Sequence, residues 1–261
     1  MRRKKPIVPI KERSANTAGY NCVCWAQAFY EKNYLLKGDD YIAPKMIPFS
    51  IQLLIKLKFI KIISTIVPKS TYAYIVARTK FFDSVIKKTI ENNFEQIILF
   101  CPGYDSRGIR LLNDNTKTKL FELDVKTTQA KKLKQLEKLK IFIPDDIAFI
   151  PMDFDNESIK DKLLNSGFKG NRRTLFVLEG AFMVLNKETV NTIFDLFRSL
   201  TGKESEIVFD YINQPVLDNH KELQMISLLS SDDIEDKYFN CSNKKSIKIK
   251  GKHFIAHAKK G

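Results

Sequence analysis

Four short apolar runs in this sequence each lead into residues that can bind a polar small molecule. The first run, Gln96–Phe100, is followed by the loop Cys101–Asp105, where Gly103 lets a ligand approach the backbone because glycine has no Cβ atom. Acidic residues close the other three runs, namely Asp124, Asp153 and Glu179. Carboxylates at such points can accept hydrogen bonds from ribose hydroxyls or amino groups, so the pattern predicts a site for a nucleoside-containing ligand.

Each of these signals also has an ordinary structural interpretation. Asp124 can be an exposed carboxylate at the end of a strand, and Asp153 or Glu179 can cap a following helix. The loop around Gly103 can be a plain strand-to-helix turn. Four such signals in the same register are much less expected by chance, and together they favour a binding site.

The position of these residues depends on alternating strands and helices. Apolar runs predict five strands, at Gln96–Phe100, Lys119–Val125, Asp146–Met152, Thr174–Leu178 and Glu206–Tyr211. Polar helical segments lie between them, at Thr127–Leu139, Ser158–Ser166 and Lys187–Leu200. This alternation predicts an α/β fold with a mostly parallel, doubly wound sheet. Ligands of such sheets bind at the carboxyl ends of the strands, where the strand order reverses.

The C-terminus departs from this alternation. Ser246–Lys250 and His253–Ala258 are short runs separated by Gly251-Lys252, which predicts an antiparallel hairpin. The hairpin would complete a sheet of seven strands.

The N-terminal part reads as helices and loops. Helices are expected over Asn21–Lys32 and Phe49–Ile66, before a long helix over Thr71–Glu91. We therefore expect a helical lid over residues 1–70 and a Rossmann-like domain over residues 71–261.

Composition narrows the classes of function. The chain has 261 residues, 44 % of them hydrophobic, and a formal net charge of +14. Its lysines are dispersed, with no stripe of arginines and aromatics, so we expect no nucleic-acid partner. Lysines interrupt the most apolar stretch, Ile47–Val67, which argues against stable membrane insertion. The four cysteines form no zinc or redox motif, so we expect no metal, and reduced thiols fit a cytoplasmic location best.

A series of motifs carries a more specific resemblance. In chain order they are Ala77–Asp83, Gly103–Arg107, Phe121–Asp124, Glu179–Leu185 and Phe209–Tyr211. Their order and spacing resemble the leucine carboxyl methyltransferase family over roughly residues 72–211, and more faintly over residues 17–44. The resemblance implies a Rossmann-like class I methyltransferase with S-adenosyl-L-methionine as its cofactor.

The resemblance also implies which residues hold that cofactor. They are Arg78, Cys101, Gly103, Tyr104, Asp105, Asp124, Asp153, Phe154 and Glu179. Arg78 would grip the methionyl carboxylate, because a guanidinium pairs bidentately with a carboxylate. Gly103 would lie against the methionine part, in a loop shaped by Tyr104 and Asp105, with Asp105 near the ammonium group.

The remaining cofactor roles follow from the same resemblance. Asp124 would hold the ribose, and Asp153 with Phe154 the adenine. Glu179 would lie near the amino-acid end of the cofactor and its methyl group.

One residue departs from the family pattern, which has glycine where this chain has Cys101. Pro102 disfavours helical backbone in the preceding residue, so we expect Cys101 in extended geometry. A side chain at this point would stand where cofactor backbone passes. We therefore hypothesise that Cys101→Gly tightens cofactor binding.

The residues near these motifs indicate which kind of group accepts the methyl. A carboxylate acceptor is already charged and needs no base, whereas a hydroxyl needs one. No histidine lies beside the motifs, so the sequence favours O-methylation of a carboxylate, on a small molecule or a protein C-terminus. Glu179 or Tyr211 could assist as catalytic residues.

Three alternatives stay open at this stage. A catalytically weak or inactive cofactor-binding protein is compatible with Cys101. A nicotinamide-dependent oxidoreductase would carry a fuller glycine fingerprint after the first strand. A nucleic-acid methyltransferase would carry a motif such as N-P-P-Y after the fourth strand, where this chain has Glu179–Phe182.

Overall fold

The structure is a computed structural model, and it describes residues 10–57, 67–112, 117–213, 220, 223–240 and 247–261. Its helices are α1 (Ile10–Tyr30), α2 (Ala43–Met46), α3 (Phe49–Lys56), α5 (Lys69–Glu91), α6 (Arg107–Leu111), α7 (Lys126–Lys138), α8 (Ile159–Asn165), α9 (Lys187–Leu200) and α10 (Ser231–Tyr238). Its strands are β1 (Gln96–Phe100), β2 (Lys119–Val125), β3 (Ile147–Met152), β4 (Thr174–Leu178), β5 (Glu206–Ile212), β6 (Gln224–Ser230) and β7 (His253–Lys259).

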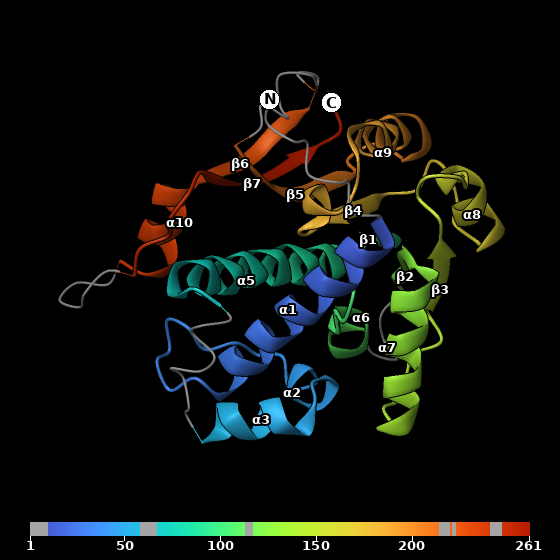
Figure 1. Ribbon diagram of the computed structural model, residues 1–261. Helices are drawn as coiled ribbons and strands as arrows, with labels where there is room; N and C mark the ends of the chain where they lie inside the picture. The colour runs from blue at the N-terminus through green and yellow to red at the C-terminus, as the bar shows by residue number, and fades with distance from the viewer. Residues whose placement is uncertain (1–9, 58–66, 113–116, 214–219, 221–222, 241–246) are drawn as a thin grey trace, which may run out of the picture.

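The strands form one seven-stranded sheet in the order β3-β2-β1-β4-β5-β7-β6 (Figure 1). The first five pair in parallel, and β7 pairs antiparallel with both β5 and β6. The strand order reverses between β1 and β4, so the carboxyl ends of these two strands flank the expected ligand site. The predicted fold class is therefore confirmed.

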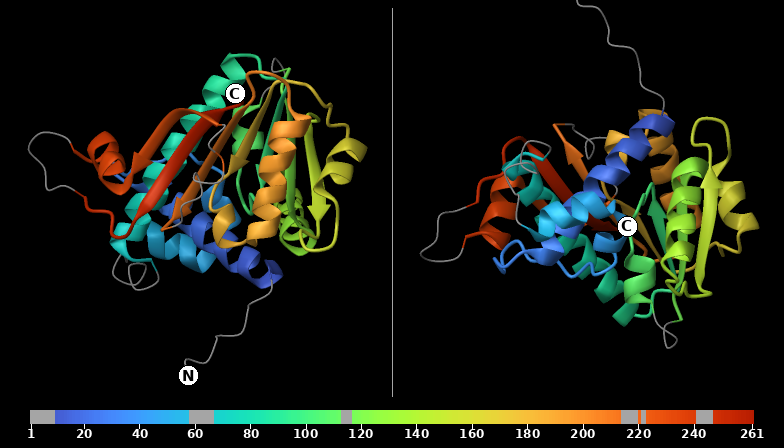
Figure 2. Two further views of the ribbon diagram at one scale, coloured as in Figure 1. Left: turned by 90° about the horizontal axis from the view of Figure 1, so that it is seen from above. Right: turned by 60° about the horizontal axis from the view of Figure 1, so that its bottom comes forward.

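Helices lie on both sides of the sheet (Figure 2), and alternate residues of the strands face these two layers. In β1, Ile97 and Leu99 belong to a core cluster shared with α1, α5 and α7. Ile98 and Phe100 point the other way, into a cluster shared with α8 and α9. Because a strand exposes successive side chains on opposite faces, both faces of the sheet are covered.

The antiparallel end of the sheet differs from the prediction in its first strand. The partner of β7 is β6, and the two are joined through α10 instead of a tight turn. Of the predicted strand at 246–250, residue 246 lies outside the described residues and 247–250 form no strand. At the sheet's edge, β6 exposes Met225, Ile226 and Leu228.

The N-terminal helices differ in length from the prediction. The first helix begins at Ile10 and ends at Tyr30, and α3 ends at Lys56. Most of the predicted continuation of α3 lies outside the described residues. Buried side chains of α1 share one core cluster with α5 and the sheet. The division into a lid and a domain at residue 70 stays a prediction.

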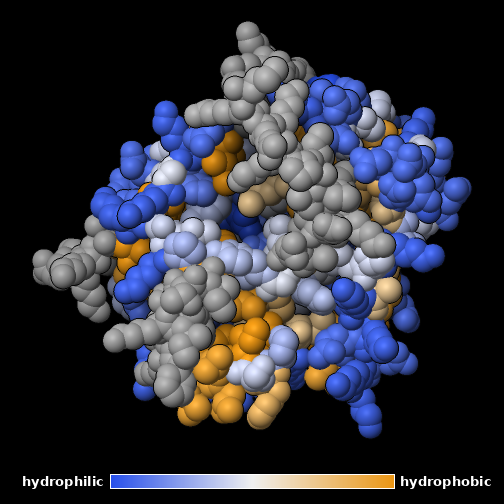
Figure 3. All heavy atoms as spheres, viewed as in Figure 1, coloured by the Kyte–Doolittle hydropathy of each residue, from blue (hydrophilic) through white to orange (hydrophobic). Residues whose placement is uncertain are grey.

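Exposed apolar side chains gather on α3. Phe49, Leu53 and Leu57 follow one another at four-residue spacing and are 75 %, 43 % and 57 % exposed. Figure 3 shows the resulting apolar area over α2 and α3. None of the helices in the described part of the chain has the length and apolar character that crossing a bilayer requires.

A buried ion pair fastens α7 to β2. The Lys132 ammonium lies 2.6 Å from the Glu122 carboxylate, and both side chains are 2 % exposed. Burial raises the pKa of Glu122 to about 7, although Lys132 opposes the shift. The pair therefore depends on both partners being present.

We expect Lys132→Met to destabilise the protein by about 3 kcal/mol, because it leaves the Glu122 carboxylate buried without a counter-charge. Adding Glu122→Leu to the same chain should recover much of this loss. The measurement is the free energy of unfolding in urea, with Lys131→Met on the exposed face of α7 as the matched control. A double variant no more stable than the single one would contradict the interpretation.

Candidate functional site

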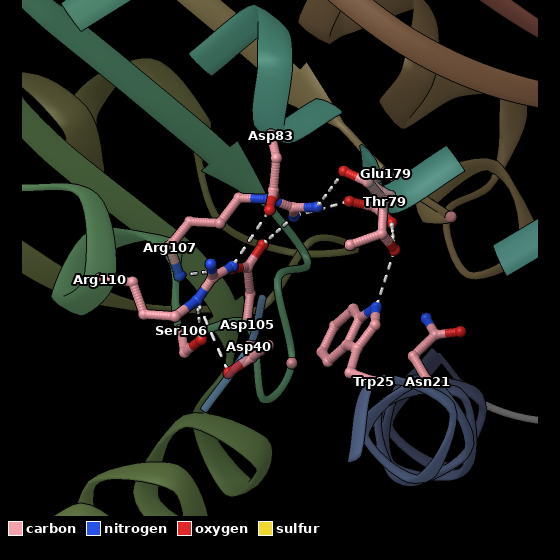
Figure 4. Close-up of polar contacts among 12 residues, drawn as sticks. Asn21, Trp25, Asp40, Thr79, Asp83, Asp105, Ser106, Arg107, Arg110 and Glu179 are labelled. Carbon is pink, nitrogen blue, oxygen red and sulfur yellow. Dashed lines mark hydrogen bonds and ion pairs between the residues drawn. The ribbon is translucent and has the colours of Figure 1, made fainter. Parts of the chain in front are cut away.

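A narrow cleft lies between the carboxyl ends of β1 and β4 and the helix α1, which carries Asn21 and Trp25 at the lower right of Figure 4. Its volume is about 20 Å³, which is room for roughly one water molecule. It is lined by Thr17, Ala18, Asn21, Trp25, Leu99, Phe100, Cys101, Pro102, Asp105, Val177, Glu179, Gly180 and Val184. Two of these lining residues, Asp105 and Glu179, have carboxylate side chains, and none has a positively charged side chain.

The loop after β1 is held in place by Asp124. One carboxylate oxygen of Asp124 accepts the Gly103 N–H at 2.6 Å, and the other accepts the Val125 N–H at 2.6 Å. Gly103 has a φ of 61°, and a Cβ atom on it would lie 2.6 Å from Cβ of Ala18. Glycine is therefore required here both by the backbone conformation and by the close approach of α1.

Cys101 does not have the predicted extended geometry. Its φ is 53°, in the left-handed region, while its N–H donates to the Leu123 carbonyl at 2.8 Å. That hydrogen bond continues the β1–β2 ladder up to the point where the chain must turn, and this outweighs the preference set by Pro102. Burial, together with the charge of Asp124, raises the pKa of the Cys101 thiol well above its usual value, so the side chain is an uncharged thiol.

Glu179, directly after β4, joins the side chains around the cleft. Its Oε1 accepts from Arg78 Nε at 3.0 Å and from the Thr79 hydroxyl at 3.3 Å. Its Oε2 lies 2.6 Å from Arg107 Nη1 but accepts no hydrogen bond of good geometry. Thr79 in turn accepts from the Trp25 indole at 2.9 Å, which links α1 to the cleft.

Arg78 lies behind the cleft wall. Besides Glu179, it pairs with Asp210 at 3.0 Å, and its side chain is 3 % exposed. Its nearest guanidinium nitrogen is 3.4 Å from the point where a Cβ on Gly180 would lie. Arg78 thus contacts the lining of the cleft through Glu179 and through Asn21 at 3.5 Å, without lining the cleft itself.

Two further charged residues were not singled out from the sequence. Arg107 is buried between Asp83, Asp105 and Glu179. Burial raises the pKa of Asp105, but the charges of Arg107 and Lys132 outweigh it and hold that pKa below its usual value.

The second of these residues, Asp210, accepts from Arg78, from the Tyr74 hydroxyl at 2.8 Å and from the Gly180 N–H. The sequence contained a signal for each of the two residues. Asp210 is an aspartate inside the apolar strand Glu206–Ile212, and Arg107 closes the motif Gly103–Arg107.

The residues predicted to hold adenine lie in a different cavity, of about 540 Å³, at the ends of β2 and β3. The Asp153 carboxylate is exposed and accepts from Asp155 N–H at 3.1 Å and from the Asn156 amide at 3.0 Å. The Phe154 side chain is mostly buried against the α8–α9 layer. The structure therefore brings this pair together, but apart from the cleft beneath α1.

Two predicted tyrosines lie outside the cleft. Tyr104 lines a large cavity of about 900 Å³ among α1, α2, α3 and α7. Tyr211 is 6 % exposed and stacks on Phe254, with ring centroids 5.1 Å apart. Of the residues predicted from the sequence, the cleft is lined by Cys101, Asp105 and Glu179.

Curated relatives match the central part of the chain. The YktD protein of Bacillus subtilis, provisionally named as an S-adenosyl-L-methionine-dependent methyltransferase, is 31 % identical over 53 % of this chain and 45 % of its own length. A protein of Mycolicibacterium gilvum with the same provisional name is 28 % identical over 52 % of this chain and 55 % of its own. The chain spans about half the length of the curated relatives it matches.

A solved structure shares the fold over the whole chain. Magnesium protoporphyrin IX methyltransferase of Synechocystis, solved with bound S-adenosylmethionine, aligns with a TM-score of 0.51 at 8 % identity. The alignment covers 99 % of this chain and 100 % of that one. At this identity the likeness concerns the fold alone.

The left-handed geometry at residue 101 generates a stability prediction. We expect Cys101→Val to be less stable than Cys101→Gly by about 1–2 kcal/mol, because β-branched residues are strongly disfavoured at positive φ. Thermal unfolding of the two variants beside the parent protein measures the difference. Equal stabilities would mean that the backbone turns differently at this residue.

The residue pattern that defines the family of leucine carboxyl methyltransferases matches residues 57–198, which is more than half of the chain and includes β1, β4 and the cleft-lining residues at their carboxyl ends. The chain therefore belongs to the leucine carboxyl methyltransferase family.

Proposed function

We propose that this protein is an S-adenosyl-L-methionine-dependent methyltransferase that methylates an oxygen, preferably of a carboxylate. The observation that carries the proposal is the cleft at the β1–β4 switch point, lined by the carboxylates of Asp105 and Glu179. Family membership and the provisional names of the relatives support the same cofactor. When bound, this cofactor supplies an electrophilic methyl group on a sulfonium.

The side chains around the cleft suit the amino-acid end of such a cofactor. Glu179 Oε2 is buried and, although it is ion-paired with Arg107, accepts no hydrogen bond of good geometry, so it can accept one from an ammonium group. Asp105 carries the second carboxylate of the lining, with its pKa held low. We propose that Arg78 acts by holding Glu179, with which it pairs, instead of gripping the cofactor carboxylate directly.

The adenosine end is proposed to extend along the sheet edge toward β2 and β3. Asp124 lies on this path at the end of β2, where its carboxylate holds the Gly103 loop, and we propose that the ribose passes beside it. The cavity beside Asp153 and Phe154 offers about 540 Å³ for the base.

The methionine end requires α1 to move. The cleft holds about one water, and Thr17, Ala18, Asn21 and Trp25 of α1 form its outer wall. We propose that α1 rises from the strand ends when the cofactor enters. Asn21 and Trp25 would then part from Arg78 and Thr79, their present partners at 3.5 and 2.9 Å.

A carboxylate acceptor fits the acid–base groups of the cleft. No histidine is among its lining residues, and His253 and His257 are engaged elsewhere, by Tyr74 and Glu206. Tyr211 is packed in the core, so Glu179 is the proposed proton acceptor should the substrate be a hydroxyl. Family membership argues against the nicotinamide-dependent alternative.

A second candidate is a protein that binds the cofactor without transferring its methyl group. It is favoured by one observation, the tight seating of α1 on the Gly103 loop. The methyltransferase and the non-catalytic binding protein would both bind the cofactor, and only the methyltransferase would transfer its methyl group.

We expect the protein to transfer a labelled methyl group from S-adenosylmethionine to an oxygen atom of at least one acceptor. The acceptors to be tested are a panel of small acids, hydroxy compounds and peptides. The product should be base-labile and release methanol, as a methyl ester does, because the cleft supplies no dedicated base. A base-stable product would indicate a hydroxyl acceptor. Cofactor binding without transfer to any panel member would favour the non-catalytic candidate.

Trp25 is the only tryptophan of the chain, so its fluorescence reports on α1 directly. We expect S-adenosylmethionine to shift its emission to longer wavelength, because the indole leaves its buried hydrogen bond with Thr79. Trp25→Phe should abolish the signal. Unchanged emission while calorimetry records binding would show that α1 stays in place.

A further inference from the structure

The buried charges around the cleft do not balance. Three guanidiniums and five carboxylates form one connected set, which we call the cleft cluster; its members are Arg78, Arg107, Arg110, Asp40, Asp83, Asp105, Glu179 and Asp210. Every side chain in the set is at most 12 % exposed. Five negative charges against three positive ones leave an excess of two negative charges away from water.

Part of this excess faces the cleft. Asp105 and Glu179 line it, whereas no guanidinium of the cluster does. Asp40 and Asp83 line a separate cavity beside Lys37, Lys80 and Lys87. The helix that covers the cleft contributes only neutral side chains to its lining, those of Thr17, Ala18, Asn21 and Trp25.

Neighbouring lysines offset the excess only in part, since Lys132 acts on Asp105 but pairs with another carboxylate. The Lys132 ammonium is taken up by Glu122 at 2.6 Å, and the Lys80 ammonium lies on the carbonyls of Tyr34 and Leu35. Asp124 adds a further carboxylate beside the loop after β1. A ligand in the cleft therefore meets a field that favours positive charge.

We propose that the cleft cluster, acting through Glu179, makes the protein select the positively charged cofactor over its neutral product. This inference rests on the proposed function. S-adenosylmethionine carries an ammonium, a sulfonium and a carboxylate, hence one net positive charge. When the methyl group passes to the acceptor oxygen, the carbon–sulfur bonding pair stays on sulfur, and the resulting thioether leaves S-adenosylhomocysteine neutral.

Loss of that charge removes a favourable interaction with the cluster at the moment the product forms. Glu179 is then a specificity-determining residue that distinguishes two ligands differing by one methyl group and one charge. Product is released readily, and inhibition by product is weak.

Calorimetric binding of three probes tests the proposal: S-adenosylmethionine, S-adenosylhomocysteine and sinefungin, an uncleavable analogue with a protonated amine near the sulfonium position. We expect the two cationic ligands to bind about ten-fold more tightly than S-adenosylhomocysteine, a difference of about 1.4 kcal/mol. Glu179→Gln should reduce this ratio to about three or less. Glu137→Gln, the same change on an exposed residue of α7, should leave the ratio intact.

The outcomes separate the two proposals. If S-adenosylhomocysteine binds the parent protein as tightly as the cationic ligands or more so, the charge selection is wrong while the proposed function stands. If none of the three binds, the proposed function fails and the inference fails with it. Should Glu179→Gln not fold by circular dichroism, Asp105→Asn replaces it with the same expected fall in the ratio.

Discussion

The buried carboxylate of Glu179 is the constraint around which the site is built. A carboxylate taken out of water is stable only with close positive partners, and Arg78 and Arg107 supply them from α5 and α6. Arg78 also pairs with Asp210 on β5, and Arg107 also pairs with Asp83 on α5 and with Asp105 in the loop after β1. One desolvated charge thus fixes the relative positions of a long helix, two strand ends and the loop between them.

This arrangement explains why the site is both rigid and charged. The guanidiniums face into the protein and hold the carboxylates, and two of the carboxylates face the cleft. Replacing the network with apolar side chains would cost the fold little in principle.

The sheet could be predicted from the sequence because its central strands are buried on both faces and read as continuous apolar runs. The strand β6 was missed, since Gln224–Ser230 mixes polar and apolar residues without a clear period and pairs with a segment more than twenty residues away. Ser246–Lys250 alternates as a strand should, yet alternation alone does not supply a partner.

Part of the site followed from the register of the strands, which brings Asp105, Asp124 and Glu179 to one edge of the sheet. The pairings of Arg107 and Asp210 did not, because they depend on which helix face meets which strand end. Phe154 and Tyr211 follow acidic residues in the sequence, but adjacency does not tell which face of the sheet an aromatic ring occupies.

The contact between Ala18 and Gly103 has a consequence for the shape of the cleft. A single methyl group resting on a residue without a side chain acts as a spacer that sets how low the covering helix lies. This contact limits how closely α1 can approach the loop, while the hydrogen bonds of Asn21 and Trp25 hold the helix down against it. A bulkier side chain at residue 18 would raise the covering helix and widen the space above the same strand ends.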